Sequence, residues 1–366
     1  KSNKLTFIDT PGHAAFTEMR SRGSKLTDVV VLVVAADDGV KPQTVESIKH
    51  AKAANVPIVV AINKCDLPEA DPQKIKNQLL EHELIAEDLS GDTLMVEISA
   101  KTKLNLDKLV DAIILQAEIL DLKTDFDSKA TGIVLESKID VGRGPVATMI
   151  VTTGTLKKGD YFVSGLRWGK IRAIIDDKGK NLNEALPSTP VEILGINGAA
   201  KAGDDFIVLD NEKEAKTLSE NRTEENKAGK NPLTFATQDS AFTDKSSKEL
   251  NLIIKSDVHG SSEAIKNAIN QIKHEEVKPK IILSDVGMVT ETDVSLAKAS
   301  DAVLIAFNVK PSKEAKKLSE NEKIKISSYN IIYEVLDYIK QRMSGLLTPD
   351  IQETITGTAQ ILEIFK

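Results

Sequence analysis

Apolar runs and amphipathic stretches alternate along the first third of the chain. Short apolar runs predict strands at residues 5–8, 29–36, 57–62 and 94–98. The run VVVLVVAA at 29–36 is continuous, which is typical of a strand buried on both faces. The intervening stretches keep apolar positions three and four apart, and they predict helices at 43–54, 72–86 and 106–120, with 14–26 helical or loop. Such strand-helix alternation predicts a parallel sheet with crossover helices over residues 1–122.

A different pattern begins at about residue 123. Residues 123–210 hold short alternating strands separated by glycine-rich turns, and this pattern predicts a small β-barrel. A Gly-Asp turn precedes an apolar strand twice, at Gly159-Asp160 and at Gly203-Asp204, as expected for hairpins.

The last third returns to α/β alternation. Residues 211–248 are polar and predict a charged helix followed by a linker. Residues 249–345 predict a second α/β unit, an α/β/α sandwich, and residues 346–366 resemble the opening of a second barrel. We therefore expect a multidomain α/β and β protein.

Composition narrows the class of protein without identifying a site. The chain is 41% apolar and 28% charged, as in an ordinary globular protein, and its longest apolar run is too short to cross a membrane. The single cysteine, Cys65, cannot form an internal disulfide, so we expect a reducing cytoplasm. A net charge of −7 gives no bulk attraction to nucleic acid, so an RNA partner would be met by local patches.

The first candidate chemistry follows the apolar run at residues 5–8, in LTFIDTPGHAAF. Asp9 stands where the end of a strand can face a ligand, and a carboxylate there can help to hold Mg²⁺ through water. Gly12 offers an amide that no side chain obstructs, and such an amide can sense a terminal phosphate. Asp-x-x-Gly alone is a weak signal, because Asp9 can equally be a turn or capping residue.

Two further loops follow buried strands in AINKCDLP and EISAKTKLN. The carboxylate of Asp66 can accept paired hydrogen bonds from N1–H and the 2-amino group of guanine, a pair that adenine lacks. The stem of Lys64 can cover the base and Asn63 can tie the loop to nearby backbone. A backbone amide within Ser99, Ala100 and Lys101 can reach the guanine O6. Each loop alone can be an ordinary turn, but the three in order at strand ends indicate a guanine-nucleotide site.

His13 follows Gly12 directly. A side chain at this position can orient the water that attacks a γ-phosphate, so we predict that His13 is catalytic. The alternative is a surface histidine in a loop.

These motifs together resemble the translation initiation factor 2 family of translational GTPases. The likeness also includes GRGPVATMIVTTGTLKKGD and SDVHGSSEAI, and it covers nearly the whole chain. The resemblance implies that residues 1–122 are part of a P-loop GTPase domain and that the barrel is a translation-factor domain. It implies that Asp9, Thr10, Pro11, Gly12 and His13 match the second-switch motif. It also implies that Asn63, Lys64 and Asp66 match the guanine-reading motif.

The resemblance further implies cofactors and partners. These are GTP or GDP with Mg²⁺, the 30S and 50S ribosomal subunits with their rRNA, and initiator formyl-methionyl-tRNA bound through a domain that this chain lacks. We expect a cytoplasmic monomer with no membrane contact. Another translational GTPase, such as an elongation or selenocysteine-specific factor, is an alternative, but an α/β unit after a single barrel disfavours it. A ribosome-binding scaffold that does not hydrolyse GTP is the other alternative.

The phosphate-binding motif of this family is missing from the sequence. No Gly-x-x-x-x-Gly-Lys-Ser/Thr occurs among the 366 residues. We therefore expect a fragment that begins after its own phosphate site and that is inactive as a GTPase on its own.

The segment SDVHGSSEA holds serine, histidine and aspartate within one loop. Asp257, His259 and Ser261 lie too close along the chain to form a catalytic line, so we expect a helix start instead. Capping by Ser261 or Ser262, with Glu263 in the first turn, is the prediction.

Overall fold

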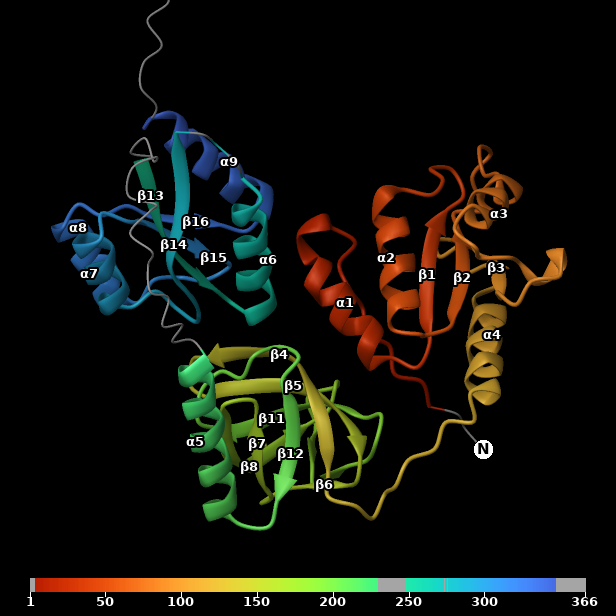
Figure 1. Ribbon diagram of the computed structural model, residues 1–366, viewed down its shortest axis with the longest axis horizontal. Coiled ribbons are helices and arrows are strands. Elements are labelled where there is room, and N and C mark those ends of the chain that lie inside the picture. The colour runs from red at the N-terminus through yellow and green to blue at the C-terminus, as the bar shows by residue number, and fades with distance from the viewer. Residues whose placement is uncertain (1–3, 230–247, 273, 275, 347–366) are drawn as a thin grey trace, which may run out of the picture.

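The computed structural model describes residues 4–229, 248–272, 274 and 276–346, and these form three packed regions (Figure 1). The described part of the first α/β region contains two short 3₁₀ helices, labelled η, among its elements: η1 (Ala14–Phe16), α1 (Thr17–Leu26), β1 (Val30–Ala35), α2 (Pro42–Ala53), β2 (Ile58–Asn63), α3 (Pro72–Leu80), η2 (Glu87–Leu89), β3 (Met95–Glu97) and α4 (Leu106–Ile119). Its sheet is parallel with the order β1-β2-β3, as the alternation predicted.

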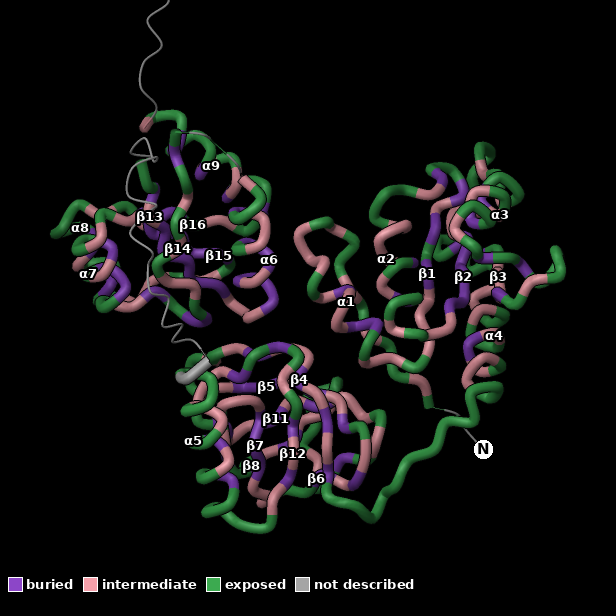
Figure 2. Tube along the Cα trace, in the orientation of Figure 1, coloured by how far each residue is buried: buried purple, intermediate pink, exposed green. Residues whose placement is uncertain are grey.

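The central strand β2 is the most deeply buried part of this sheet. Residues 58–62 are all buried, and Figure 2 shows buried segments running through β1 and β2. The helix α3 begins where Asp71 accepts a hydrogen bond from the amide of Lys74 and Pro72 supplies the first helical residue. It ends at Leu80 rather than at residue 86, because the chain turns there through Glu83 in the left-handed region.

The predicted strand at residues 5–8 is wrong. Residues 4–13 have no regular secondary structure, and Phe7 is 67% exposed. A strand needs a partner for its backbone groups, and among the described residues β1 pairs only with β2. The other edge of β1 is open, and Val33 on this strand is 58% exposed.

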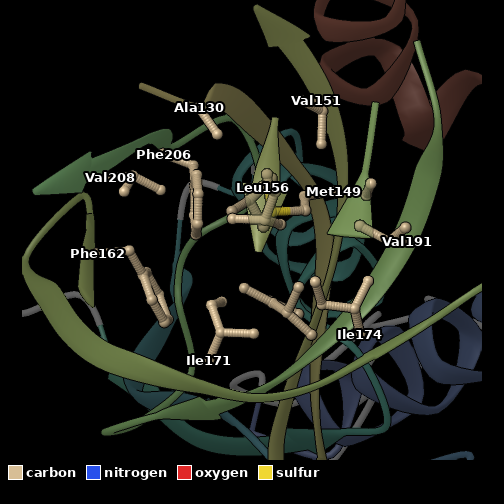
Figure 3. Close-up of a cluster of buried hydrophobic side chains, with 14 of the residues drawn as sticks. Ala130, Met149, Val151, Leu156, Phe162, Ile171, Ile174, Val191, Phe206 and Val208 are labelled. Atoms are coloured by element: carbon tan, nitrogen blue, oxygen red, sulfur yellow. The ribbon is translucent and has the colours of Figure 1, made fainter. Parts of the chain in front are cut away.

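The middle region is a closed barrel, as predicted. Its strands are β4 (Thr131–Asp140), β5 (Gly144–Thr153), β6 (Leu156–Lys157), β7 (Tyr161–Ser164), β8 (Arg167–Ile175), β9 (Asn181–Leu182), β10 (Glu184–Ala185), β11 (Pro190–Ile196) and β12 (Asp205–Leu209). The order β11-β5-β4-β12-β7-β8 closes through pairing of β11 with β8. Phe162 and Phe206 stack inside it with ring centroids 4.7 Å apart, and Figure 3 shows Met149 and Ile174 among the side chains that fill the same core. The charged helix α5 (Glu212–Gly229) follows and lies against β7 and β8.

The second α/β region has a parallel sheet covered on both faces. Its elements are β13 (Lys248–Ser256), α6 (His259–Asn270), β14 (Val277–Val286), α7 (Glu291–Ala299), β15 (Val303–Phe307), α8 (Lys313–Asn321), β16 (Ile326–Tyr329) and α9 (Ile332–Ser344). The order is β14-β13-β15-β16. One core cluster joins the sheet to α6 and α9, and another joins it to α7 and α8. The predicted opening of a second barrel, at 346–366, lies outside the described residues except for Leu346.

The helix α6 begins differently from the prediction. Its N-cap is Val258, with no side-chain capping bond, so capping by Ser261 or Ser262 is wrong. Both serines are buried in the first turn, where the Ser262 hydroxyl instead lies 2.6 Å from the Ser284 hydroxyl. The helix therefore starts at His259, before both serines, and packs Ser262 against β14.

Candidate functional site

Two loops at the carboxyl ends of β2 and β3 are joined by hydrogen bonds. We call residues 63–66 and 99–101 the strand-end loops. The side-chain oxygen of Asn63 accepts from the amide of Lys64 at 2.8 Å and from the amide of Ala100 at 3.0 Å. Asn63 thus ties the first loop to the second, because parallel strands end at the same edge of the sheet.

A second contact joins the same loops through a carboxylate. The buried hydroxyl of Ser99 donates to Asp66 Oδ1 at 2.7 Å and accepts from the amide of Thr102 at 3.1 Å. The hydrogen bond from Ser99 lowers the pKa of the Asp66 carboxyl below its usual value. Asp66 is therefore an exposed, ionised acceptor whose orientation is fixed by the neighbouring loop.

The backbone amides of the second loop are not equally available. The amide of Ser99 donates to the carbonyl of Leu104 at 3.2 Å, and the amide of Ala100 donates to Asn63. Within the described part of the chain, the amide of Lys101 donates to no protein group. If a ligand oxygen meets this loop, Lys101 is the residue whose amide is free to bind it.

The ammonium group of Lys64 lies near the carboxyl end of β1. The Lys64 backbone has a φ of 66°, and its ammonium contacts both carboxylate oxygens of Asp37, at 3.0 and 2.8 Å. The hydrogen bond between them raises the pKa of Lys64 and lowers the pKa of Asp37. The Lys64 stem consequently spans from β2 to the loop after β1, beside Asp66.

The N-terminal segment, residues 9–13, lies along a different part of the first α/β region. Asp9, Thr10 and Gly12 line a hollow of about 390 Å³ between α1, α2 and the open edge of β1. Asp9 and Gly12 are exposed, and no heavy atom lies within 4 Å of where a Gly12 side chain would begin. Among the described residues, hydrogen bonds link the strand-end loops to each other and none links them to this segment.

A buried arginine holds the backbone of the N-terminal segment. Arg20 on α1 is 5% exposed and donates to the carbonyls of Pro11 at 3.1 Å and His13 at 2.7 Å. It also forms an ion pair of 3.0 Å with Glu46 on α2. Burial alone would raise the pKa of Glu46, but the bonds from Thr17 and Arg20 outweigh it and the pKa is lowered. Arg20 therefore connects the segment to the helix that covers the sheet.

The side chain of His13 faces the second α/β region. Its Nδ1 accepts from the amide of Ala15 at 2.9 Å and so caps η1, and its ring centroid lies 4.4 Å from that of Tyr333 on α9. Ala15 and Phe16 pack against the core cluster that includes α6 and α9. Figure 1 shows α1 between α6 and α2, and contacts join α1 to both helices.

The donor chemistry of the segment suits a hard cation only in part. Asp9 makes no hydrogen bond or ion pair within the described part of the chain, so its carboxylate is free to hold Mg²⁺ through water. In the described ranges no group of three or more His, Cys, Asp or Glu side chains gathers into a metal site. Asp9 can therefore supply one carboxylate to a Mg²⁺ site, and the other oxygen ligands would have to come from other groups.

Sequence reasoning missed Arg20 and Tyr333. Arg20 follows Phe16 by four residues and precedes Gly23 by three, so the three residues share one helical face. A charged residue beside Phe16 on that face was the signal from which Arg20 could have been found. Tyr333 gave no local signal, because it meets His13 from 320 residues further along the chain.

Family models match three parts of the chain. The model described as Elongation factor Tu GTP binding domain matches residues 1–118, and Elongation factor G domain 2 matches residues 129–209. The model described as Translation-initiation factor 2 matches residues 224–340. No helix in the described ranges has the length and apolar character that a membrane crossing needs.

Individual relatives extend the match to the full chain. The chain is 86% identical over 366 residues to translation initiation factor IF-2 of Pelagibacter ubique and covers 50% of that protein. It is 53% identical over 368 residues to translation initiation factor IF-2 of Bartonella bacilliformis and covers 43% of it. The chain thus spans about half the length of the curated relatives that it matches.

A solved structure agrees with these matches. The crystal structure of GDP-bound aIF5B from Aeropyrum pernix aligns with a TM-score of 0.52 at 25% identity, over 93% of this chain and 63% of that one. The fold, the family models and the identity to named relatives agree: the chain belongs to the translation initiation factor 2 family of translational GTPases.

Proposed function

We propose that the protein, at the length of its relatives, binds GTP and GDP and hydrolyses GTP on the ribosome during translation initiation. The observation that carries the proposal is the joining of the two strand-end loops by Asn63 and by the Asp66–Ser99 hydrogen bond. Two loops from neighbouring strand ends are thereby held together around one exposed carboxylate.

The strand-end loops supply what recognition of guanine needs. Asp66 presents an ionised carboxylate to the N1–H and 2-amino donors, and Ser99 fixes its direction. The amide of Lys101 is the free donor for the O6 carbonyl, and the Lys64 stem can lie over the ring. Asn63 supports the site without touching the base, since its oxygen is used by two backbone amides.

The N-terminal segment supplies the hydrolytic part of the proposal. Asp9 would hold Mg²⁺ through water, Thr10 and Pro11 lie beside it, and the amide of Gly12 would sense the γ-phosphate. His13 would orient the attacking water. Bound Mg²⁺ would neutralise charge that develops on the phosphates.

The proposed partners are inferred from the family to which the chain belongs, and not from a surface of this chain. We propose that the 30S and 50S ribosomal subunits bind the protein, and that it promotes placement of initiator formyl-methionyl-tRNA and subunit joining in the cytoplasm. Because the 366 residues contain no phosphate-binding loop motif, we expect this chain alone to bind GTP weakly and to be inactive. Tight binding of GTP by the chain alone would contradict that expectation.

The test is ribosome-stimulated hydrolysis by the protein extended to the length of its relatives. The variant His13→Ala should keep GTP affinity within about twofold and slow stimulated turnover by roughly 100-fold or more, because a water-orienting group contributes about 10²–10⁴-fold. The variant His82→Ala, on the turn after α3, serves as the control. Equal turnover of the His13 variant and the control would remove His13 from the chemistry.

A further inference from the structure

The imidazole of His13 has no nitrogen available for water. Nδ1 accepts the hydrogen bond from the amide of Ala15, and Nε2 is buried with no hydrogen-bond partner in the described part of the chain. A histidine that orients a water must present one nitrogen to it. The conformation of His13 seen here is therefore withdrawn from hydrolysis.

The group against this ring comes from the second α/β region. Tyr333 lies in the first turn of α9, with its ring tilted by 42° to that of His13. The ring of Phe16 also meets the His13 ring, edge-on, with the two ring centroids 6.0 Å apart. Tyr333 is itself 57% exposed and lies outside the core cluster that includes α9, so core packing does not hold its side chain.

The backbone of the segment is held separately from its side chain. Arg20 binds the carbonyls of Pro11 and His13 from the first α/β region, whereas the contact from Tyr333 is made with the His13 ring. Rotation of the His13 side chain can therefore free its nitrogens while the backbone stays in place. Such rotation breaks the Ala15 bond and the contact with Tyr333.

We propose that Tyr333 is a positioning residue that keeps His13 withdrawn, and that separation of α9 from the N-terminal segment releases His13 for hydrolysis. The proposal rests on the proposed function, in which His13 orients the attacking water. When the contact with Tyr333 is lost, the conformation with His13 released gains population. Turnover therefore depends on whether α9 of the second α/β region lies against the N-terminal segment.

The contact can be tested first in the 366-residue chain without nucleotide. In NMR spectra, the ring protons of His13 should carry a ring-current shift that Tyr333→Phe keeps and that Tyr333→Leu reduces to the contribution of Phe16. His50, which pairs with Glu46 in the first α/β region, should not move in either variant. A His13 signal that is the same in Tyr333→Leu as in the unaltered chain would overturn the contact itself.

Hydrolysis without ribosomes tests the consequence in the protein extended to the length of its relatives. Tyr333→Leu should raise the ribosome-independent rate by about 2- to 10-fold, as expected for loss of one aromatic contact. Tyr333→Phe should retain the low rate, and adding His13→Ala to Tyr333→Leu should abolish the gain. A merely structural role would not make the gain depend on His13.

Failure of this proposal differs from failure of the proposed function. If Tyr333→Leu leaves the ribosome-independent rate unchanged while His13→Ala slows stimulated turnover, the positioning role is wrong and the function stands. If His13→Ala leaves stimulated turnover unchanged, the water-orienting role fails and this proposal fails with it.

Discussion

The strand-end loops and the N-terminal segment would carry the two halves of the proposed chemistry, yet different parts of the molecule hold them. Asn63, Asp66 and Ser99 bind one another within the first α/β region. The N-terminal segment instead takes its backbone support from Arg20 and its side-chain contact from Tyr333 in the second α/β region.

This difference separates a site fixed by local structure from one that depends on assembly. The first strand-end loop follows the buried strand β2, and the register between β2 and β3 fixes where each loop begins. The N-terminal segment has no strand of its own, so distant contacts set its conformation. We infer that base recognition is built into one region, whereas hydrolysis is coupled to the arrangement of two.

The largest expected effect comes from removing the support of the N-terminal segment. Arg20→Ala should lower the free energy of unfolding of the first α/β region by about 2–4 kcal/mol, because the carbonyls of Pro11 and His13 lose a buried donor and Glu46 loses its arginine partner. Calorimetric unfolding measures this loss. Lys25→Ala, an exposed lysine on the same helix, should change stability by less than about 0.5 kcal/mol. Equal unfolding temperatures for the two variants would show that Arg20 does not hold the segment.

A smaller effect is expected in the strand-end loops. Ser99→Ala should cost about 1 kcal/mol, because the amide of Thr102 and the carboxylate of Asp66 both lose a partner. The pKa of Asp66 should rise toward its ordinary value, which NMR titration of the carboxyl can follow. The exposed neighbour Thr102 provides the control as Thr102→Ala. An unchanged Asp66 titration would mean that Ser99 does not orient this carboxylate.

The smallest effect is expected where the three regions meet. Burial, with a contribution from Asp257, raises the pKa of Glu136 on β4, and the position where a Gly260 side chain would begin lies 3.2 Å from its carboxylate. A carboxyl with a raised folded-state pKa binds its proton more tightly when folded, so its ionisation lowers stability as pH rises through that pKa. Glu136→Gln should therefore stabilise the protein by about 0.5 kcal/mol at neutral pH.

The difference in stability between Glu136→Gln and the unaltered protein should depend on pH, and this dependence tests the assignment. As pH falls through the raised pKa toward the ordinary value of 4.5, the unaltered protein becomes protonated and the advantage of Glu136→Gln should disappear. Unfolding midpoints in urea at several pH values measure it. Burial lowers the pKa of His259. Because His259 is present in both proteins, its contribution to the pH dependence of stability cancels from the comparison. A difference that grows on acidification would contradict the assignment.

Sequence patterns predicted the parts of the molecule that local structure decides. Apolar runs located β1, β2 and β3, and the residues directly after the last two located the strand-end loops. The predicted strand at residues 5–8 failed because a strand also needs a neighbour, which is no property of its own sequence. Tyr333 was missed for a related reason, since stacking between residues 13 and 333 depends on how two regions pack.

The most direct test of the account asks which base the Asp66 carboxylate selects. In the protein extended to the length of its relatives, Asp66→Asn should weaken GTP by about 30- to 150-fold and favour XTP, because an amide matches the extra carbonyl of xanthine. Equilibrium competition between the two nucleotides measures this, with Glu69→Gln on the same exposed turn as the control. A reversed preference in Asp66→Asn alone is the predicted result, and an undiminished preference for GTP would contradict the account.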